Sequence, residues 1–344
     1  MDRGRSCLCG AAALVFLEAL GCFATLAGAQ GGVGVNYGTK GDNLPTADKV
    51  VNLFKSRNIQ FLRLFDPNPD ALNALHGSGI SVVLGTLNQD LQQLAGSQDA
   101  AAQWVAAHVT PHANAVKFRY ISAGNEVIPG DLASFVLPAM QNLDAALKAA
   151  GTPVPVTTSI ATTVLGVSYP PSQGSFSSDT AGLITPILGF LAANGTPLLV
   201  NVYPYFAIAS DPANIRLDYA LFTATGTVVQ DGALAYNNLF DAVVDATYAA
   251  IERAGQPGVK IVVSETGWPS GGNGDLTTPA NAATYNNNAV KHAVSGNGTP
   301  RRPGGGIEVY LFAIFNEDQK PGGVEQHFGL YNPDITEVYH VDFP

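Results

Sequence analysis

Short apolar runs rich in strand-forming residues recur along the chain, and segments rich in alanine and leucine separate them. The apolar runs, which we predict to be strands, are 32–37, 61–65, 81–86, 117–123, 154–160, 198–203, 260–264 and 308–315. These runs are apolar almost throughout, as parallel strands are when both faces of their sheet are buried. The pattern therefore predicts a parallel sheet that is covered on both faces.

The segments between these runs repeat their apolar residues with the period of a helix, as Leu143, Ala146 and Leu147 do. We predict helices at 48–57, 69–76, 100–108, 131–150, 180–193, 236–254 and 279–292. Stop signals support some of these ends, such as Gly151 followed by Pro153. Eight strands that alternate with helices, without a linker-like break in composition, predict an α/β protein with a single-domain (β/α)8 TIM barrel.

An open, doubly wound sheet is the rival arrangement, and it predicts a nucleotide-binding glycine motif after the first strand. The glycines of residues 32–38 have the wrong spacing, and no helix opens on the last of them. We therefore interpret this stretch as the first barrel strand and its turn. Two long loops, 166–179 and 269–278, follow the fifth and seventh strands and are expected to wall a substrate groove.

The amino terminus has the features of a secretory signal peptide. Arg3 and Arg5 precede an apolar stretch that ends in small residues at Ala29, and Glu18 makes the stretch a poor membrane span. We predict a signal peptide at 1–29 and a catalytic domain at 30–344. All three cysteines lie in the segment to be removed, so the mature chain should contain no disulfide, cysteine nucleophile or thiolate metal site.

The net charge of −10 makes nucleic acid and anionic membranes unfavourable partners, whereas neutral polymers such as polysaccharides stay compatible. The zinc motif H-E-x-x-H and the hydrolase motif G-x-S-x-G are both absent from the sequence. We therefore expect no cofactor and no metal. Two glycosylation sequons, at Asn194 and Asn297, are each followed by proline, and their occupancy stays open.

Two of the predicted strands deliver a lone glutamate at or just past their carboxyl ends. Glu126 follows the fourth strand and Glu265 the seventh, and turn-forming residues come after each of them. Because strand ends meet at one face of a barrel, this pair could serve as the two carboxyl groups of a glycosidase. Sequence alone leaves open whether they lie about 5–5.5 Å apart, for retention, or about 6.5–9.5 Å apart, for inversion.

Several strings together resemble the plant endo-β-1,3-glucanases of glycoside hydrolase family 17 over the whole mature length. They are Val35-Asn36-Tyr37-Gly38, Ala123-Gly124-Asn125-Glu126, Asn201-Val202-Tyr203-Pro204-Tyr205-Phe206, Val263-Ser264-Glu265-Thr266-Gly267-Trp268-Pro269-Ser270 and Phe315-Asn316-Glu317-Asp318-Gln319-Lys320-Pro321. The resemblance implies that Glu126 is the proton donor, that Glu265 is the nucleophile and that the products keep their anomeric configuration.

Other polar residues are expected to support this pair. The resemblance also implies supporting roles for Glu317 and Lys320, and a lysine near two carboxylates would keep one of them ionised. The amide of Asn125 could donate to the 2-hydroxyl of the substrate.

Aromatic residues at strand ends could stack on the apolar faces of sugars. We expect Tyr37, Tyr203 and Trp268 to contact substrate, while Phe206 is equally compatible with ordinary packing.

The expected function is secreted, retaining, internal hydrolysis of β-1,3-glucan by a monomer in the apoplast, cell wall or vacuole. The same motifs fit a β-1,3;1,4-glucanase of the lichenase type. From another class, a catalytically silent carbohydrate-binding defence protein is the remaining alternative, although the two intact glutamates disfavour it. The sequence does not choose between plant defence, callose turnover and wall remodelling.

Overall fold

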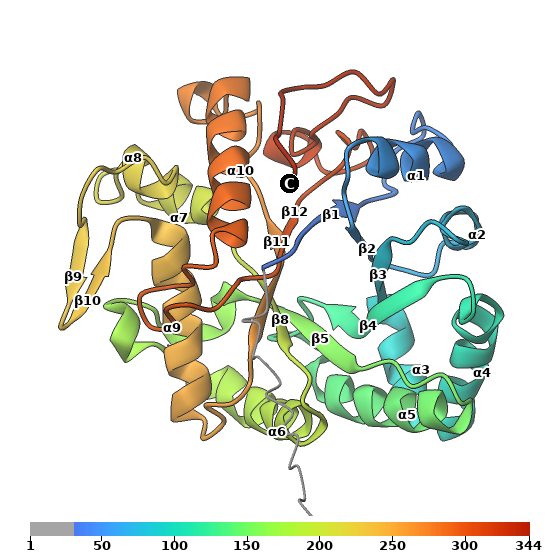
Figure 1. Cartoon of the computed structure of the whole chain (residues 1–344). Helices are drawn as coiled ribbons and strands as arrows, with labels where there is room; N and C mark the ends of the chain where they lie inside the picture. The colour runs from blue at the N-terminus through green and yellow to red at the C-terminus, as the bar shows by residue number, and fades with distance from the viewer. Residues whose placement is uncertain (1–30) are drawn as a thin grey trace, which may run out of the picture.

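The computed structural model describes residues 31–344, in which eight parallel strands close into a barrel ringed by helices (Figure 1). Around the barrel the strands follow the order of the chain, and β1 closes on β12. The barrel strands are β1 Val33–Tyr37, β2 Phe61–Leu64, β3 Ser81–Gly85, β4 Lys117–Asn125, β5 Val156–Ala161, β8 Leu198–Asn201, β11 Ile261–Thr266 and β12 Val309–Leu311. All eight predicted strand segments are confirmed, with ends that shift by a few residues.

All seven predicted helices are present, and residues 31–344 contain three further short α-helices that were not predicted. The helices are α1 Ala47–Ser56, α2 Pro69–Ala74, α3 Leu91–Gly96, α4 Gln98–His108, α5 Val136–Ala149, α6 Ser178–Asn194, α7 Pro204–Ser210, α8 Leu217–Ala220, α9 Leu239–Arg253 and α10 Pro279–Val294. The unpredicted ones, α3, α7 and α8, have at most seven residues. Such short segments carry too few turns for an apolar period to stand out.

Two small antiparallel hairpins lie outside the barrel. They pair β6 Leu165–Val167 with β7 Ser175–Phe176, and β9 Val229–Asp231 with β10 Leu234–Tyr236. Figure 1 shows the β9–β10 hairpin at the edge of the molecule, beside α9. The helix predicted from residue 236 begins only at Leu239, because Tyr236 is paired in β10.

The core has two layers, which follow from the alternation of side chains along each strand. In β3, Val82 and Leu84 belong to the large cluster that includes the helices, whereas Val83 belongs to a smaller one. That smaller cluster also contains Leu199 and Tyr310 from other barrel strands, so it fills the barrel interior. The apolar character of the predicted strands is explained, since both of their faces are buried.

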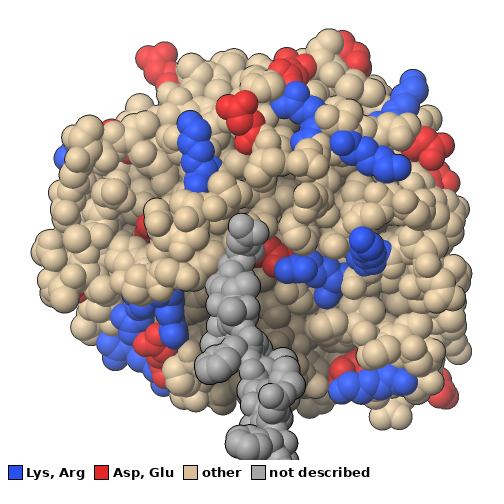
Figure 2. Space-filling view, viewed as in Figure 1, with Lys and Arg blue, Asp and Glu red and all other residues tan. Residues whose placement is uncertain are grey.

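Acidic and basic side chains are interspersed on the face seen in Figure 2, so the net charge is not gathered there in a single patch. Within residues 31–344, no helix has the length and apolar character needed to cross a membrane. The predicted signal peptide at 1–29 lies outside the described residues.

Candidate active site

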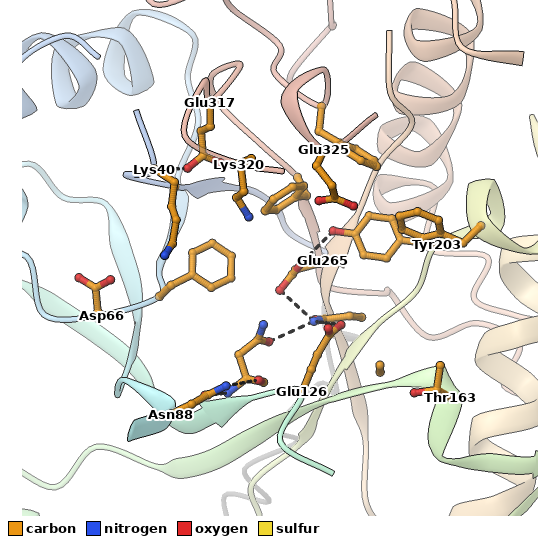
Figure 3. A pocket seen from close by; sticks show the side chains of 18 of the residues that line it. Lys40, Asp66, Asn88, Glu126, Thr163, Tyr203, Glu265, Glu317, Lys320 and Glu325 are labelled. Atoms are coloured by element: carbon orange, nitrogen blue, oxygen red, sulfur yellow. Dashed lines mark hydrogen bonds between the residues drawn. The ribbon is translucent and has the colours of Figure 1, made fainter. Parts of the chain in front are cut away.

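A groove of about 740 Å³ lies where the eight barrel strands end. Every barrel strand contributes to its lining, either by its last residues or by those that follow it. Figure 3 shows Glu126 and Glu265 pointing into the middle of this groove. The two predicted glutamates are therefore brought together, although 139 residues separate Glu126 from Glu265 along the chain.

The backbone at the end of β4 turns two consecutive side chains toward one place. In a regular strand, Asn125 and Glu126 would point to opposite faces. Here the pairing with β5 is bulged between Ser122 and Asn125, and both Gly124 (φ 75°) and Glu126 (φ 54°) are left-handed. Glycine suits this position because a Cβ on Gly124 would also lie 2.7 Å from a side-chain carbon of Val127.

A second irregularity shapes the end of β11. Its pairing with β8 shifts between Val263 and Glu265, so that Ser264 and Glu265 both reach the side chain of Asn201. Bulges of this kind re-aim side chains next to active sites. Both acids of the pair thus depend on a local break in strand alternation.

Glu265 is enclosed by hydrogen-bond donors. Its Oε1 accepts from Arg63 Nη1 at 2.9 Å and from Asn201 Nδ2 at 2.8 Å, and its Oε2 accepts from the Tyr203 hydroxyl at 2.8 Å. Only 1% of the Arg63 side chain and 8% of the Glu265 side chain are exposed. Burial raises the pKa of Glu265, while the Arg63 charge and the Tyr203 hydrogen bond lower it, so the carboxylate depends on these groups for its ionisation.

Glu126 has a different environment. Its side chain is exposed to the groove, and within the described part of the chain its carboxyl accepts one hydrogen bond, from Asn201 Nδ2 at 2.8 Å. The same nitrogen lies 2.8 Å from Glu265 Oε1. The two carboxyl oxygens are therefore at most twice 2.8 Å, or 5.6 Å, apart.

The side chain of Asn125 has a defined orientation. Its Oδ1 accepts from Arg63 Nη2 at 2.8 Å and from Asn201 Nδ2 at 3.1 Å. Its backbone N–H donates to Asn88 Oδ1, and Asn88 donates back to its carbonyl oxygen. Because the oxygen is occupied, the Asn125 amide NH2 is the end left to donate, and its contact with a sugar hydroxyl stays a prediction.

Glu317 and Lys320 both line the groove, as the sequence predicted, but in the described part of the chain the hydrogen bonds and ion pair of the Glu265 carboxylate go to other residues. Glu317 is buried, which raises its pKa, and its carboxylate accepts the Lys40 backbone N–H at 2.7 Å. This hydrogen bond connects the loop after β1 to the loop after β12. The Lys320 ammonium lies 5.1 Å from the centre of the Phe312 ring, and its charge helps to lower the pKa of Glu265.

Two of the four predicted aromatic platforms lie at the groove. Tyr203 lines it beside Glu265, and Phe206, which is 42% exposed, lines it next to Tyr203. Trp268 does not: it is 0% exposed, packs on Tyr205 and Tyr285, and donates its indole N–H to the Leu276 carbonyl.

Tyr37 is also buried, at 6% exposure, and does not line the groove. The expectation that Tyr37 and Trp268 contact substrate is therefore wrong. Tyr37 stands next to the groove residue Gly38 and Trp268 three positions after Glu265, but both side chains are packed in the core.

The expected groove walls also need correction, since no residue of 166–179 or 269–278 lines the groove. The first of these loops packs on an outer helix instead. A Cβ on Gly174 would lie 2.0 Å from the Ala246 carbonyl oxygen of α9, so only glycine allows this approach. The walls come from shorter segments, such as Gly38–Lys40 after β1 and Thr162–Thr163 after β5.

Two residues that surround Glu265 were given no role by the sequence reasoning. Arg63, rather than Lys320, is the ion-pair partner of Glu265, and Asn201 bridges the two acids. Arg63 does carry a signal, because it is the one charged residue within the apolar run 61–65. A buried arginine in a parallel strand needs a charged or polar partner inside the barrel.

Comparison with known proteins agrees with this geometry. The family model described as "Glycosyl hydrolases family 17" matches residues 33–343. Among solved structures, the chain is similar to CJP38, a beta-1,3-glucanase and allergen of Cryptomeria japonica pollen. The TM-score is 0.88 at 47% identity, covering 91% of this chain and 99% of that one.

Two curated plant proteins with different names are similarly related to this chain. A "Glucan endo-1,3-beta-glucosidase" of Vitis vinifera is 53% identical over 323 residues, which cover 92% of each chain. "Lichenase-2" of Hordeum vulgare is 49% identical over 312 residues, which cover 90% of this chain and 98% of that one.

Proposed function

This chain belongs to glycosyl hydrolases family 17, and on that premise we propose that it cuts internal β-1,3-glucosidic bonds of β-1,3-glucans by a retaining mechanism, with Glu265 as nucleophile and Glu126 as acid and base. The glycosidase activity itself follows from membership, since the family model spans nearly the whole described chain. Glucans such as callose, laminarin and fungal wall glucan are the substrates to which the proposal applies.

The two glutamates differ in how many hydrogen-bond donors surround them, and this difference supports the roles proposed for them. Glu265 accepts from Arg63, Asn201 and Tyr203, one of which is a buried cation. These donors favour the ionised carboxylate that a nucleophile must be. Glu126 faces no comparable set and is exposed to the groove, which suits a carboxyl that holds and releases a proton.

The close approach of the two acids supports retention. A limit of 5.6 Å between their nearest oxygens agrees with the spacing of about 5–5.5 Å found for retaining glycosidases. In the first step a Glu265 oxygen bonds to the anomeric carbon, the bond to the leaving sugar breaks, and that sugar's oxygen takes the proton of Glu126. In the second step Glu126 takes a proton from water, whose oxygen bonds to the anomeric carbon and displaces Glu265.

Internal cleavage is supported by the shape of the site, which is a groove rather than an enclosed pocket. The preference for β-1,3 bonds rests on the relatives named for that activity. A β-1,3;1,4-glucanase stays the second candidate, because Lichenase-2 is nearly as similar to this chain as the Vitis vinifera glucosidase is. A silent binding protein is disfavoured, since a pure binder gains nothing from a buried carboxylate beside a second acid.

Product analysis on laminarin beside mixed-linkage glucan tests the proposal. Laminarin should shorten before free glucose accumulates, and NMR should detect the β-anomer as the first product. An initial α-anomer would contradict the double displacement, and glucose as the sole early product would contradict internal cleavage. Faster cutting of mixed-linkage glucan would move the assignment to the second candidate.

We also propose that the protein is secreted to the apoplast and cell wall or delivered to the vacuole, where it acts as a monomer. The signal-like segment 1–29 and the lack of cysteine after residue 22 support an oxidising compartment. A role in plant defence belongs to the same proposal, with callose turnover and wall remodelling as the alternatives.

A further inference from the structure

The side chain of Asn201, at the end of β8, lies beneath the two acids and joins them. Its Nδ2 is 2.8 Å from Glu126 Oε1, 2.8 Å from Glu265 Oε1 and 3.1 Å from Asn125 Oδ1. With 2% of its surface exposed, Asn201 is too deeply buried to be an ordinary sugar-binding side chain.

The orientation of this amide is fixed by its own oxygen. Asn201 Oδ1 accepts from the Ser264 hydroxyl at 2.7 Å and from the Ser159 hydroxyl at 3.1 Å. These two hydroxyls lie 2.9 Å from each other. The flipped amide would set its NH2 against both serines and its oxygen against two carboxyl oxygens, so the NH2 group faces the acids.

An amide NH2 has two hydrogens, but three acceptors lie within reach of Asn201 Nδ2. The three hydrogen bonds cannot all be complete at once. The hydrogens must therefore be shared in proportion to how strongly each acceptor attracts them. A charged oxygen attracts an N–H about twice as strongly as a neutral one.

We propose that Asn201 is a positioning residue that serves both halves of the double displacement, by giving its hydrogen bond to whichever carboxylate is charged. This rests on the roles proposed for Glu126 and Glu265. Before the first step Glu265 carries the negative charge, and after it Glu265 is an ester while Glu126 has lost its proton. Because the amide nitrogen is equally distant from both oxygens, it can follow this change of charge without moving.

The inference is tested with a 2-deoxy-2-fluoro laminaribioside that carries a dinitrophenyl leaving group, a probe that slows both steps. The rate of inactivation reports the attack of Glu265, and the rate of reactivation reports hydrolysis of the ester. Asn201→Ala should slow inactivation, because Glu265 loses a donor that keeps it ionised and in place, and should slow reactivation, because the charge that returns to Glu265 loses the same donor. We expect about 10²-fold or more in each step, the size of effect that the loss of one donor to a developing charge has elsewhere. On laminarin its kcat should fall while KM stays close to the wild-type value, because Asn201 holds the acids and not the sugar.

Asn286→Ala is the matched control for losing a buried asparagine. Asn286 is fully buried on α10 and donates to the Ala282 carbonyl and the Tyr339 hydroxyl, away from the groove. The Asn286→Ala variant should melt at a lower temperature than the wild type, while its inactivation and reactivation rates stay unchanged. If Asn201→Ala does not fold, Asn201→Asp replaces it, since aspartate keeps the shape and the two serine contacts but, when ionised, has no N–H to give.

If a folded Asn201 variant has the same inactivation rate and the same reactivation rate as the wild type, the inference is overturned. A loss that is confined to one of the two steps, or to KM, would overturn it too. The proposed function has its own readout in the same experiment. If the probe does not label Glu265 of the wild-type enzyme, the assignment of the nucleophile fails, whatever the Asn201 variants do.

Discussion

At the residue level, the site depends on side chains that depart from the alternation of a regular strand, in which successive side chains point to opposite faces. Asn125 and Glu126 are neighbours in the chain and yet reach one nitrogen, because the left-handed backbone at Gly124 and Glu126 cancels their alternation. Left-handed φ values are uncommon for residues other than glycine and tend to occur at functional sites.

Replacing Glu265 by glutamine should reduce turnover of laminarin by about 10³-fold or more, because an amide cannot form the glycosyl ester. The fold should persist, since the glutamine oxygen can still accept from Arg63 and Asn201, while its NH2 group, in place of Oε2, can donate to the Tyr203 hydroxyl oxygen. Initial rates and a circular dichroism spectrum check the two parts. More than about a tenth of the wild-type rate in this variant would rule out Glu265 as nucleophile, because covalent catalysis has no partial substitute.

Glu126→Gln should lose about 10²- to 10⁴-fold on laminarin, whose leaving sugar needs a proton. The first step on a dinitrophenyl glycoside should change far less, because that leaving group departs without protonation. Burst kinetics on the aryl substrate separate the two steps. Equal losses on both substrates would indicate that Glu126 has a structural role instead.

Arg63→Met should move the acidic limb of the pH–rate profile to higher pH. Burial already raises the pKa of Glu265, and the Arg63 charge is the largest influence that opposes it. Without that charge the carboxyl stays protonated up to a higher pH, so the nucleophile ionises later. Arg63→Lys, which keeps a charge but loses the fork to Asn125 and Ser264, should shift the limb less. An unmoved limb in the methionine variant would contradict this account.

At the level of elements, α9 carries a polar face that ties peripheral segments to the barrel. Asp245 is fully buried and accepts from the Tyr236 hydroxyl of β10, from the Arg301 backbone N–H and from Thr299. One carboxylate thus holds the β9–β10 hairpin and the loop around residue 300 against the helix. Thr299 also completes the second glycosylation sequon, so in the folded protein its hydroxyl is engaged by Asp245.

Asp245 should make stability depend on pH. Burial raises its pKa from 3.8 to about 6 despite the three donors, so the folded state binds this proton more tightly than the unfolded state does. Its contribution is therefore fully present below about pH 4 and is lost as the pH rises to about 6, a change of about 3 kcal/mol for a shift of about two units.

Denaturant unfolding of Asp245→Asn at pH 4 and pH 7 checks this dependence. The variant should be less stable than the wild type, because an NH2 group replaces one of the two oxygens that accept hydrogen bonds. The deficit should shrink by about 3 kcal/mol between pH 4 and pH 7, since the cost of the buried charge is removed. A deficit that is the same at both pH values would show that Asp245 does not titrate in this range.

At the level of the whole molecule, closure of the barrel brings two glutamates that are far apart in the sequence into one site. Arg63 and Glu265 lie 202 positions apart, and they meet because β2 and β11 both end at the same rim. Residues 31–344 contain no cysteine, so a large packed core rather than disulfides stabilises this closure.

The mature protein should begin at or within a residue or two of Gln30 and contain no titratable thiol. Intact-mass measurement and thiol titration on protein isolated from the secreted or vacuolar fraction test this. A mature chain that retains Cys22 would overturn the argument for an oxidising compartment.

The sequence by itself determined the barrel and its pair of acids. Its eight apolar runs require two buried faces, and alternation with helices makes the strands parallel, so all of their carboxyl ends meet at one rim. Glu126 and Glu265 follow such runs, so strand order alone places them at the same rim. Arg63, a charged residue inside a buried apolar run, could have been recognised from the sequence in the same way, and it is the partner of Glu265 that the sequence led us to expect in Lys320.

Only the tertiary structure decided what lies beyond the strand ends and around the acids. Past the last paired residue, alternation no longer tells which way a side chain points, so Trp268 and Tyr37 were expected in the groove and are buried instead. Loop length did not indicate the groove walls either, because residues 166–179 pack on α9 through Gly174. The bridging role of Asn201 likewise arises only when β4, β5, β8 and β11 come within hydrogen-bonding distance of one another, which depends on the bulges that set their register.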